Sequence, residues 1–519
     1  MHARVILRVA ILLLGIICGA MWIVTAFVPL LGDERSIAVS WACSSLFMSL
    51  PAACGAWWMW NSRKAPTPTP SLKDGFAGVG LGWLAAVFSA AFPFWNVLKM
   101  RWPDAIFEAS SGLSTTGASV LADGIRLGDA TVLTGAVLDN LPRSLLFWRA
   151  ILNWLGGIGI IYFVLLILPM MHGGQGKMLY NAEVPGLKTA GDQLTPRLST
   201  AMKLVLAFYC LLTLLAIGVY WALGMTRFDA VCHAFSTVST GGFSPHSEGM
   251  AIYGTRPLLQ WSIVLFMFIS ACNFSLFLRS FSARRFLLWQ DEEFRFFSCM
   301  FAIAVLFAFG MLWWKRPDGV MTLNGVNVPR GVEGYLRIAA FQMASLVSTT
   351  GFATSDYLTW NVPAVTLLIA GVMIPCGCGG STAGGMKVGR LLVVFKQLRN
   401  EIIQCLSPRR LLSVHLNGER IEPSLIGKTM AFAVLYLLLI LGFAFLVAVL
   451  DNADLGTALG ASLTCVSNVG PGFGKVGPAG SFTAFSPLVK FLLSLAMIAG
   501  RLELYTMLVM VFPSFWEKS

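Results

Sequence analysis

Charge is scarce in this 519-residue sequence, since Asp, Glu, Lys and Arg together make up 12% of it. A soluble globular chain carries about 25% charged residues, so this composition excludes a soluble enzyme or binding domain. Hydrophobic residues instead supply 56% of the chain, and its mean hydropathy is +0.74. The composition therefore indicates a polytopic membrane protein whose apolar spans form one bundle in the lipid bilayer.

Residues that bind metals or catalyse reactions are also few. The chain has 5 histidines at unrelated spacings, and no second cysteine pair accompanies Cys376 and Cys378. No His-Glu-x-x-His pattern and no cluster of carboxylates within the apolar runs is visible. We therefore expect neither an enzyme nor an organic cofactor.

The formal net charge of +12 first suggests a nucleic-acid partner, but the charges lie in short loops between apolar runs. We therefore expect no nucleic acid to bind. If the N-terminus is cytoplasmic, the inner loops hold 22 of the 37 Lys and Arg residues and the outer segments hold 13. Because basic residues accumulate in cytoplasmic loops, this bias predicts that both termini are cytoplasmic.

Ten apolar runs are long enough to cross a bilayer, which takes about 20 residues. The first resembles a signal peptide, but its length and the closely following second run favour a retained helix. Four shorter and more polar segments lie between the runs, and we expect them to form re-entrant half-helices near 103–114, 228–239, 335–348 and 455–467. The ten expected spans lie near 5–31, 37–60, 75–97, 144–171, 200–224, 257–283, 296–314, 362–400, 425–450 and 484–513.

A short glycine motif recurs four times, each time after a half-helix and before a long apolar run. Its copies begin at Ser114, Val238, Ser348 and Ser467, and its key glycines are spaced by 124, 110 and 119 residues. Each unit therefore has the order helix, half-helix, glycine loop, helix. Four such units predict an all-α fold of four pseudo-symmetric helix–pore loop–helix repeats around one pore, with two further N-terminal helices.

The chemistry of these loops is that of a potassium filter, which replaces the hydration shell of the ion with carbonyl oxygens. Glycine tolerates the backbone angles that such a loop requires, whereas a β-branched residue does not. For one loop alone, helix packing is the more economical explanation, as for Gly78 to Gly82 and Gly156 to Gly159. Four loops in one repeat pattern favour the filter.

At these motifs the sequence resembles the Trk/Ktr/HKT superfamily of potassium transporters, most closely its bacterial TrkH-type potassium uptake subunits. The resemblance covers nearly the whole chain, and the two extra N-terminal helices match the TrkH type. In plant relatives, a serine at the first filter glycine accompanies sodium transport, so glycine at all four positions implies a preference for potassium. The resemblance implies that potassium binds at the filter residues Thr115, Thr116, Gly117, Ser239, Thr240, Gly241, Thr349, Thr350, Gly351, Asn468, Val469 and Gly470.

The resemblance also implies a gate, because the inner helix of the third repeat is interrupted in this superfamily by a glycine-rich intramembrane loop. Here Pro375 and five glycines within eleven residues oppose a continuous helix, at about 1 kcal/mol per glycine. The alternative is a flexible hinge without a gating role. The gate residues implied are Gly377, Gly379, Gly380, Ser381, Thr382, Gly384 and Gly385.

Arg501 lies inside the last apolar run, where a charge is costly and usually functional. The resemblance implies that it lies in the pore below the filter, opposite the gate loop. Its alternative role is to anchor contacts between helices.

The predicted organisation is two N-terminal helices at 1–66 and pore repeats at 67–172, 173–286, 287–412 and 413–519. The resemblance implies a homodimer in the bacterial inner membrane and a separate, cytoplasmic TrkA-type ring that binds nucleotide. Potassium is then the transported substrate. An alternating-access secondary transporter is the alternative function, because such proteins also use broken helices.

Overall fold

The protein was analysed as a computed structural model that describes residues 3–61, 71–170, 194–285, 287–410 and 412–517. Its N-terminal half contains α1 (Ala3–Leu31), α2 (Arg35–Asn61), α3 (Leu72–Leu98), α4 (Trp102–Leu113), α5 (Arg143–Met170), α7 (Leu194–Ala222), α8 (Arg227–Val238), α9 (Pro257–Ser270) and α10 (Phe274–Ala283). The C-terminal half contains α11 (Glu292–Lys315), α12 (Val332–Val347), α13 (Pro363–Val372), α14 (Val388–Leu406), α15 (Pro423–Asp451), α16 (Leu455–Ser467), α17 (Pro487–Arg501), α18 (Tyr505–Leu508) and α19 (Pro513–Trp516).

The chain is a helical membrane protein. Within the described residues, six helices are long and apolar enough to cross a bilayer: α1, α2, α3, α7, α11 and α15. Two helix pairs are sharply bent, by 91° between α9 and α10 and by 120° between α17 and α18. The continuous spans expected over 257–283 and 484–513 are therefore broken spans or re-entrant segments, and the run 362–400 divides into α13, a loop and α14.

The four expected half-helices are present as α4, α8, α12 and α16. Their side chains are largely buried, and two begin at a side-chain cap. Thr226 accepts a hydrogen bond from the Asp229 amide at the start of α8, and Asp454 does the same for Thr457 at the start of α16. These caps satisfy backbone N–H groups that have no partner within the helix.

A proline marks the start of each helix that follows a glycine loop. Pro257, Pro363 and Pro487 occupy the first turn of α9, α13 and α17, and Pro142 directly precedes α5. Proline fits this position because its fixed φ is helical and its missing N–H would have no partner there. The four units thus share a helix start as well as a glycine motif.

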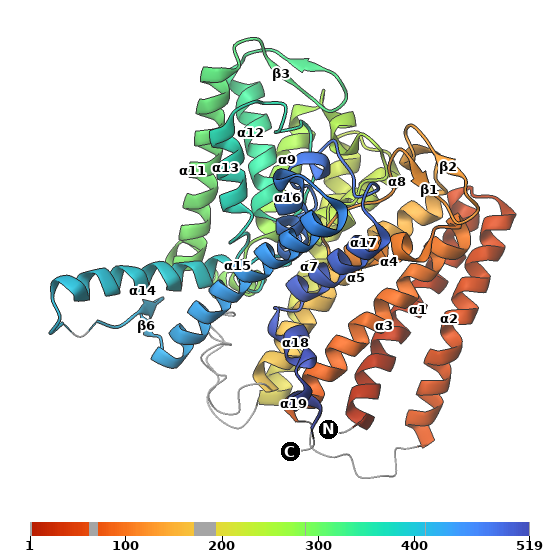
Figure 1. Ribbon diagram of the computed structural model, residues 1–519, viewed down its shortest axis with the longest axis horizontal. Helices are drawn as coiled ribbons and strands as arrows, with labels where there is room; N and C mark the ends of the chain where they lie inside the picture. The colour runs from red at the N-terminus through yellow and green to blue at the C-terminus, as the bar shows by residue number, and fades with distance from the viewer. Residues whose placement is uncertain (1–2, 62–70, 171–193, 286, 411, 518–519) are drawn as a thin grey trace.

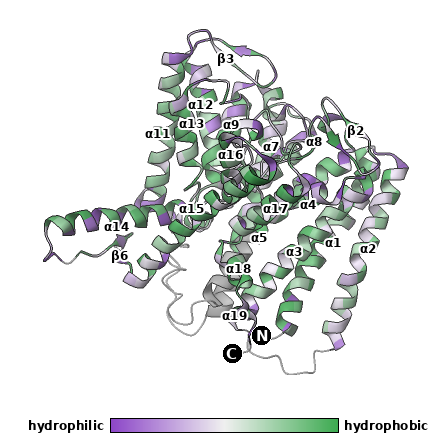
Figure 2. Cartoon of the chain, viewed as in Figure 1, coloured by the Kyte–Doolittle hydropathy of each residue, from purple (hydrophilic) through white to green (hydrophobic). Residues whose placement is uncertain are grey.

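The helices form one bundle, with α1, α2 and α3 side by side at one edge and α14 extending away from the opposite edge (Figure 1). The start of α1 and the short helix α19 lie at the same end of this bundle. Hydrophobic residues run along α1, α3 and α15, whereas hydrophilic and hydrophobic residues are interspersed along α14 (Figure 2). Large apolar side chains on the outer helices, such as Leu30, Leu214 and Phe445, are exposed and suit contact with lipid.

Three short antiparallel hairpins connect helices of this all-helical fold. They pair β1 (Ile125–Arg126) with β2 (Val132–Leu133), β3 (Val320–Met321) with β4 (Asn327–Val328), and β5 (His415–Leu416) with β6 (Glu419–Arg420). The first two lie at the end of the bundle opposite α19, and β6 lies beside α14 (Figure 1). The predicted boundaries at 66/67 and 172/173 fall outside the described residues.

Candidate functional site

The four short helices end in the same unusual way. A residue just beyond each helix end, the second after α4, α8 and α12 and the first after α16, adopts a left-handed backbone, with φ of 52° at Thr115, 56° at Thr240, 59° at Thr349 and 55° at Asn468. For a β-branched residue such as threonine, this conformation costs about 1–3 kcal/mol and persists only where the surroundings enforce it. Its recurrence at four positions makes these residues structurally equivalent.

Backbone hydrogen bonds align the four loops with one another in the same way. The residue that follows each left-handed residue donates its N–H to the carbonyl five positions earlier, near the end of the short helix. The donor–acceptor distances are 2.9 Å for Thr116–Ser111, 2.8 Å for Gly241–Ser236, 2.8 Å for Thr350–Ser345 and 3.0 Å for Val469–Thr464. Thr116, Gly241, Thr350 and Val469 are therefore equivalent.

The next residue is a glycine with positive φ in every loop, and here the structure corrects one expectation. The four equivalent glycines are Gly117, Gly242, Gly351 and Gly470, with φ of 80°, 73°, 80° and 104°. The motif in the sequence predicts Gly241 as the filter glycine of the second loop, which is one residue too early. Two adjacent glycines make either choice compatible with the motif, and only the backbone conformation distinguishes them.

These glycines form a closed ring. A Cβ built on Gly117 would lie 2.6 Å from the carbonyl oxygen of Gly241, and one on Gly470 would lie 2.8 Å from that of Thr116. A Cβ on Gly242 would come closer still to the carbonyl of Thr350, and one on Gly351 to that of Val469. Each loop therefore touches the next in the same rotational sense, and the fourth touches the first. At these four glycines, the neighbouring loop leaves no room for a Cβ.

The hydroxyl groups of the loops are buried beside this ring. Ser114 and Thr116 share a hydrogen bond of 2.6 Å, and Ser348 and Thr350 share an equivalent one of 2.7 Å. Ser239, the equivalent of Ser114 and Ser348, instead donates to the carbonyl of Phe235, because Gly241 occupies the position of Thr116 and Thr350 and has no hydroxyl.

The fourth loop is tied to the first by an amide. Asn468 donates from Nδ2 to Thr116 Oγ1 at 2.9 Å and to the Met497 carbonyl at 2.9 Å. Among the described residues, the Oγ1 of Thr115 and the Oδ1 of Asn468 are buried without a hydrogen-bond partner. Oxygen atoms of this kind are suitable ligands for an alkali cation.

The glycine-rich segment between α13 and α14 lies against the ends of three short helices. Thr382 donates its hydroxyl to the carbonyl of Val238, the last residue of α8, at 3.0 Å. Gly384 donates its N–H to Thr349 Oγ1 at 2.7 Å, and a Cβ on Gly384 would overlap the carbonyl of Ser467. This segment, residues 376–387, is called the gate loop below, and its predicted residues lie together directly beside the ring.

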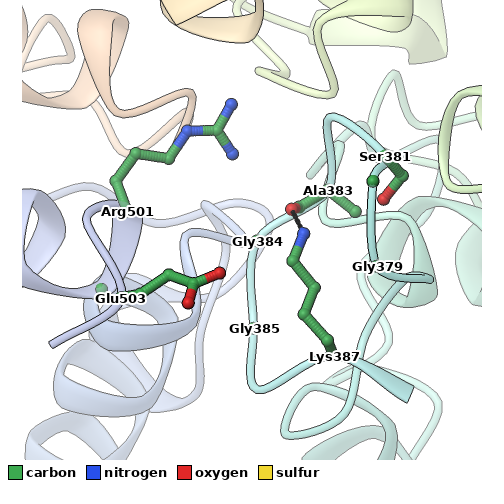
Figure 3. A pocket seen from close by; sticks show the side chains of 10 residues that line it. Gly379, Ser381, Ala383, Gly384, Gly385, Lys387, Arg501 and Glu503 are labelled. Carbon is green, nitrogen blue, oxygen red and sulfur yellow. Dashed lines mark hydrogen bonds between the residues drawn. The ribbon is translucent and has the colours of Figure 1, made fainter. Parts of the chain in front are cut away.

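Arg501 contacts the gate loop from α17. The guanidinium is buried and donates from Nη1 to the Thr382 carbonyl at 2.7 Å and from Nη2 to the Gly156 carbonyl at 3.3 Å. Figure 3 shows Arg501 and Glu503 on one side of a small pocket and the gate loop on the other, with Lys387 bonded to the Ala383 carbonyl. A fixed cation thus lies against the loop.

Comparison with known proteins identifies the family. The model of the TrkH cation transport proteins matches residues 46–518. The chain belongs to this family. It is 33% identical to the Trk system potassium uptake protein TrkH of Escherichia coli K12 and 32% identical to that of Halomonas elongata, over the full length of all three chains. The crystal structure of the potassium transporter TrkH from Vibrio parahaemolyticus superposes with a TM-score of 0.84 at 29% identity, and covers both chains completely.

Membership of the TrkH family makes this chain a multi-pass transport protein and not an enzyme, as the sequence predicts. In this TrkH-family chain, two buried ion pairs support the ring from outside. Glu108 on α4 pairs with Arg149 on α5 at 2.8 Å, and Arg149 also donates to the carbonyl of Ser244, just after the second loop. Asp104 at the start of α4 pairs with Lys490 on α17 at 2.6 Å.

No local sequence pattern predicts which partners these charges have. The positions of Arg149 and Lys490 in the sequence do indicate that each has a partner. Both fall within apolar runs, where an ionisable residue is usually paired. Glu293 was also missed, although it accepts two hydrogen bonds from the gate-loop region. Its partners are 86 and 96 residues away, so no local pattern indicates them.

Proposed function

We propose that this chain is the potassium-conducting subunit of a bacterial potassium uptake system. The observation that carries the proposal is the closed ring of four loops, in which each glycine touches a carbonyl of the next loop. A ring of backbone carbonyls can replace the water around a dehydrated cation. The curated relatives from Escherichia coli and Halomonas elongata are named potassium uptake proteins, which supports potassium as the transported ion.

In this proposal, the ring is a selectivity filter and the four units are pseudo-symmetric pore repeats. Potassium contacts the carbonyl and hydroxyl oxygens of the residues expected from the sequence, with Gly242 added to the second loop. The short helices end at the ring, and the partial negative charge at their C-termini favours a cation beside it. The repeats are those predicted at 67–172, 173–286, 287–412 and 413–519, preceded by two helices within 1–66.

The gate loop and Arg501 form the proposed gate. The hydrogen bonds of the loop to Val238, Thr349 and Arg501 hold glycine-rich backbone against the ring. Potassium passes only when these bonds are broken, and the guanidinium charge repels a cation while the loop is closed. The predicted gate residues Gly377, Gly379, Gly380, Ser381, Thr382, Gly384 and Gly385 all belong to this loop.

The ring favours a channel-like pore over an alternating-access transporter. Inverted repeats would be related by an axis in the membrane plane, so that half of the units would have the opposite direction. Here all four glycines contact the next loop in the same sense, which is the pattern of rotation about a single axis.

The proposed setting is the inner membrane of a bacterium, with both termini cytoplasmic. The start of α1 and helix α19 lie at the same end of the bundle, which is compatible with termini on one side (Figure 1). We further propose a homodimer and a cytoplasmic TrkA-type nucleotide-binding ring as partners, since the relatives are components of a Trk system.

Uptake of radioactive rubidium into proteoliposomes tests the proposal. We expect potassium to compete strongly and sodium weakly in the unmodified protein, and Gly117→Ser to increase competition by sodium. Gly442→Ser is the control, because a Cβ on Gly442 meets no atom within 4 Å. Equal competition by both ions in the unmodified protein, or unchanged selectivity in Gly117→Ser, would contradict the filter assignment.

A further inference from the structure

Glu293 is a buried acidic residue that does not cap its own helix. It lies in the first turn of α11 and is 3% exposed. The cap of this helix is Asp291, whose Oδ1 accepts the Phe294 amide at 2.9 Å. Glu293 therefore faces other elements, and a carboxylate removed from water needs strong partners.

Those partners are backbone amides at both ends of the gate loop. Glu293 Oε1 accepts a hydrogen bond from Gly379 at 2.7 Å and another from Gly389 at 2.9 Å. Gly379 lies within the loop and Gly389 lies in the first turn of α14. One oxygen atom thus joins the segment that enters the loop to the helix that leaves it.

The base of the loop is closed by backbone bonds at the same place. Met386 donates to the Ile374 carbonyl at 2.9 Å, and Val388 donates to the Gly377 carbonyl at 3.0 Å. The position is favourable for a negative charge, because the free N–H groups at the start of α14 carry partial positive charge. A Cβ on Gly389 would lie 2.9 Å from Oε1, so glycine is needed for this approach.

The hairpin β5–β6 holds the start of α11 in place. Asn417, in the turn of this hairpin, donates from Nδ2 to Asp291 at 2.8 Å and accepts the Glu292 amide at 2.8 Å. Glu293 is therefore the next residue in a segment already fixed on its other side. A carboxylate held in this way acts as a rigid support rather than as a mobile side chain.

We propose that Glu293 is a positioning residue that fastens the base of the gate loop and so stabilises the closed pore. This inference rests on the proposed function of that loop. Loss of the carboxylate leaves two buried amides without their acceptor, and the loop then gains freedom at both ends. Other residues of the loop, Thr382 and Gly384, make the contacts with the ring, so we expect ion binding at the ring to be unaffected.

Rubidium uptake by the chain alone, without a cytoplasmic partner, provides the test. We expect Glu293→Ala to raise the maximal basal rate about tenfold, while the half-saturating rubidium concentration stays unchanged. Glu293→Gln keeps an acceptor oxygen at the same position, so we expect a smaller increase in the basal rate. Glu292→Gln is the matched control. The Glu292 carboxylate is adjacent in the sequence but pairs with Lys396 and not with the gate loop.

Arg501→Ala separates this inference from the proposed gate. If Arg501→Ala raises basal uptake and both Glu293 variants do not, the role of Glu293 is refuted and the gate stands. If none of the three variants raises uptake, the gate assignment fails and the inference fails with it. If Glu293→Ala does not elute as a single species in gel filtration, Glu293→Gln provides the test instead. Basal uptake by Glu293→Gln below that of the unmodified protein would also refute the inference.

Discussion

Alanine at Gly242 and at Gly241 should have very different effects, although the two residues are adjacent. Gly242 has a φ of +73°, and its Cβ would overlap the carbonyl oxygen of Thr350, so the neighbouring loop must move. The left-handed backbone alone costs an alanine about 1–2 kcal/mol. Gly241 has no such φ, and the nearest atoms to its Cβ all belong to Asn153 on α5, whose own Cβ would lie 2.8 Å away, so Asn153 must shift.

A free-energy change of about 1.4 kcal/mol corresponds to a tenfold change in an equilibrium constant. We therefore expect Gly242→Ala to reduce potassium-over-sodium selectivity at least about tenfold, because the displaced carbonyl belongs to the ring. Gly241→Ala should change selectivity less, by about threefold, because the residue that must shift, Asn153, lies on α5 and contributes no carbonyl to the ring.

The measurement is rubidium uptake with potassium or sodium as the competitor, for both variants and for Gly442→Ala as the control. Protein amount and elution in gel filtration should be matched before rates are compared. Loss of selectivity in Gly241→Ala together with normal selectivity in Gly242→Ala would show that the backbone alignment of the second loop is incorrect.

Two further predictions concern charged groups outside the ring. Lys490→Met should destabilise the protein by about 3 kcal/mol, the lower end for a broken buried pair, because Arg101 still bonds to Asp104; an unchanged unfolding midpoint in detergent would refute this. His246 bonds to Asp229 and Asp139, and the bond to Asp229 is the main reason that its pKa is raised above 6.5. Its stabilising effect is therefore complete below about pH 6.5 and is lost as the pH rises through the raised pKa. The unfolding midpoint should fall over this range, and His246→Gln should remove that fall; an equal fall in the variant would exclude His246 as its source.

Much of the fold follows from local sequence. Apolar runs and the shorter polar segments between them located all four short helices to within three residues at their boundaries, because hydropathy and helix caps act over a few residues. The break between α9 and α10 was missed, since Ala271, Cys272 and Asn273 contain neither glycine nor proline. That break is stabilised from outside, where Phe274 donates to the Gly380 carbonyl at 3.3 Å.

The sequence by itself determined that the chain lies in a membrane, that it contains four glycine loops and that Arg501 and the gate loop are candidates for function. Tertiary structure alone decided that the loops close into a ring, that Gly242 is the fourth equivalent glycine and that Glu293 joins the ends of the gate loop. The physical reason is the distance along the chain over which each interaction acts. Helix formation and apolar burial depend on neighbouring residues, whereas the space left for a Cβ and the partners of a buried carboxylate depend on segments about a hundred residues away.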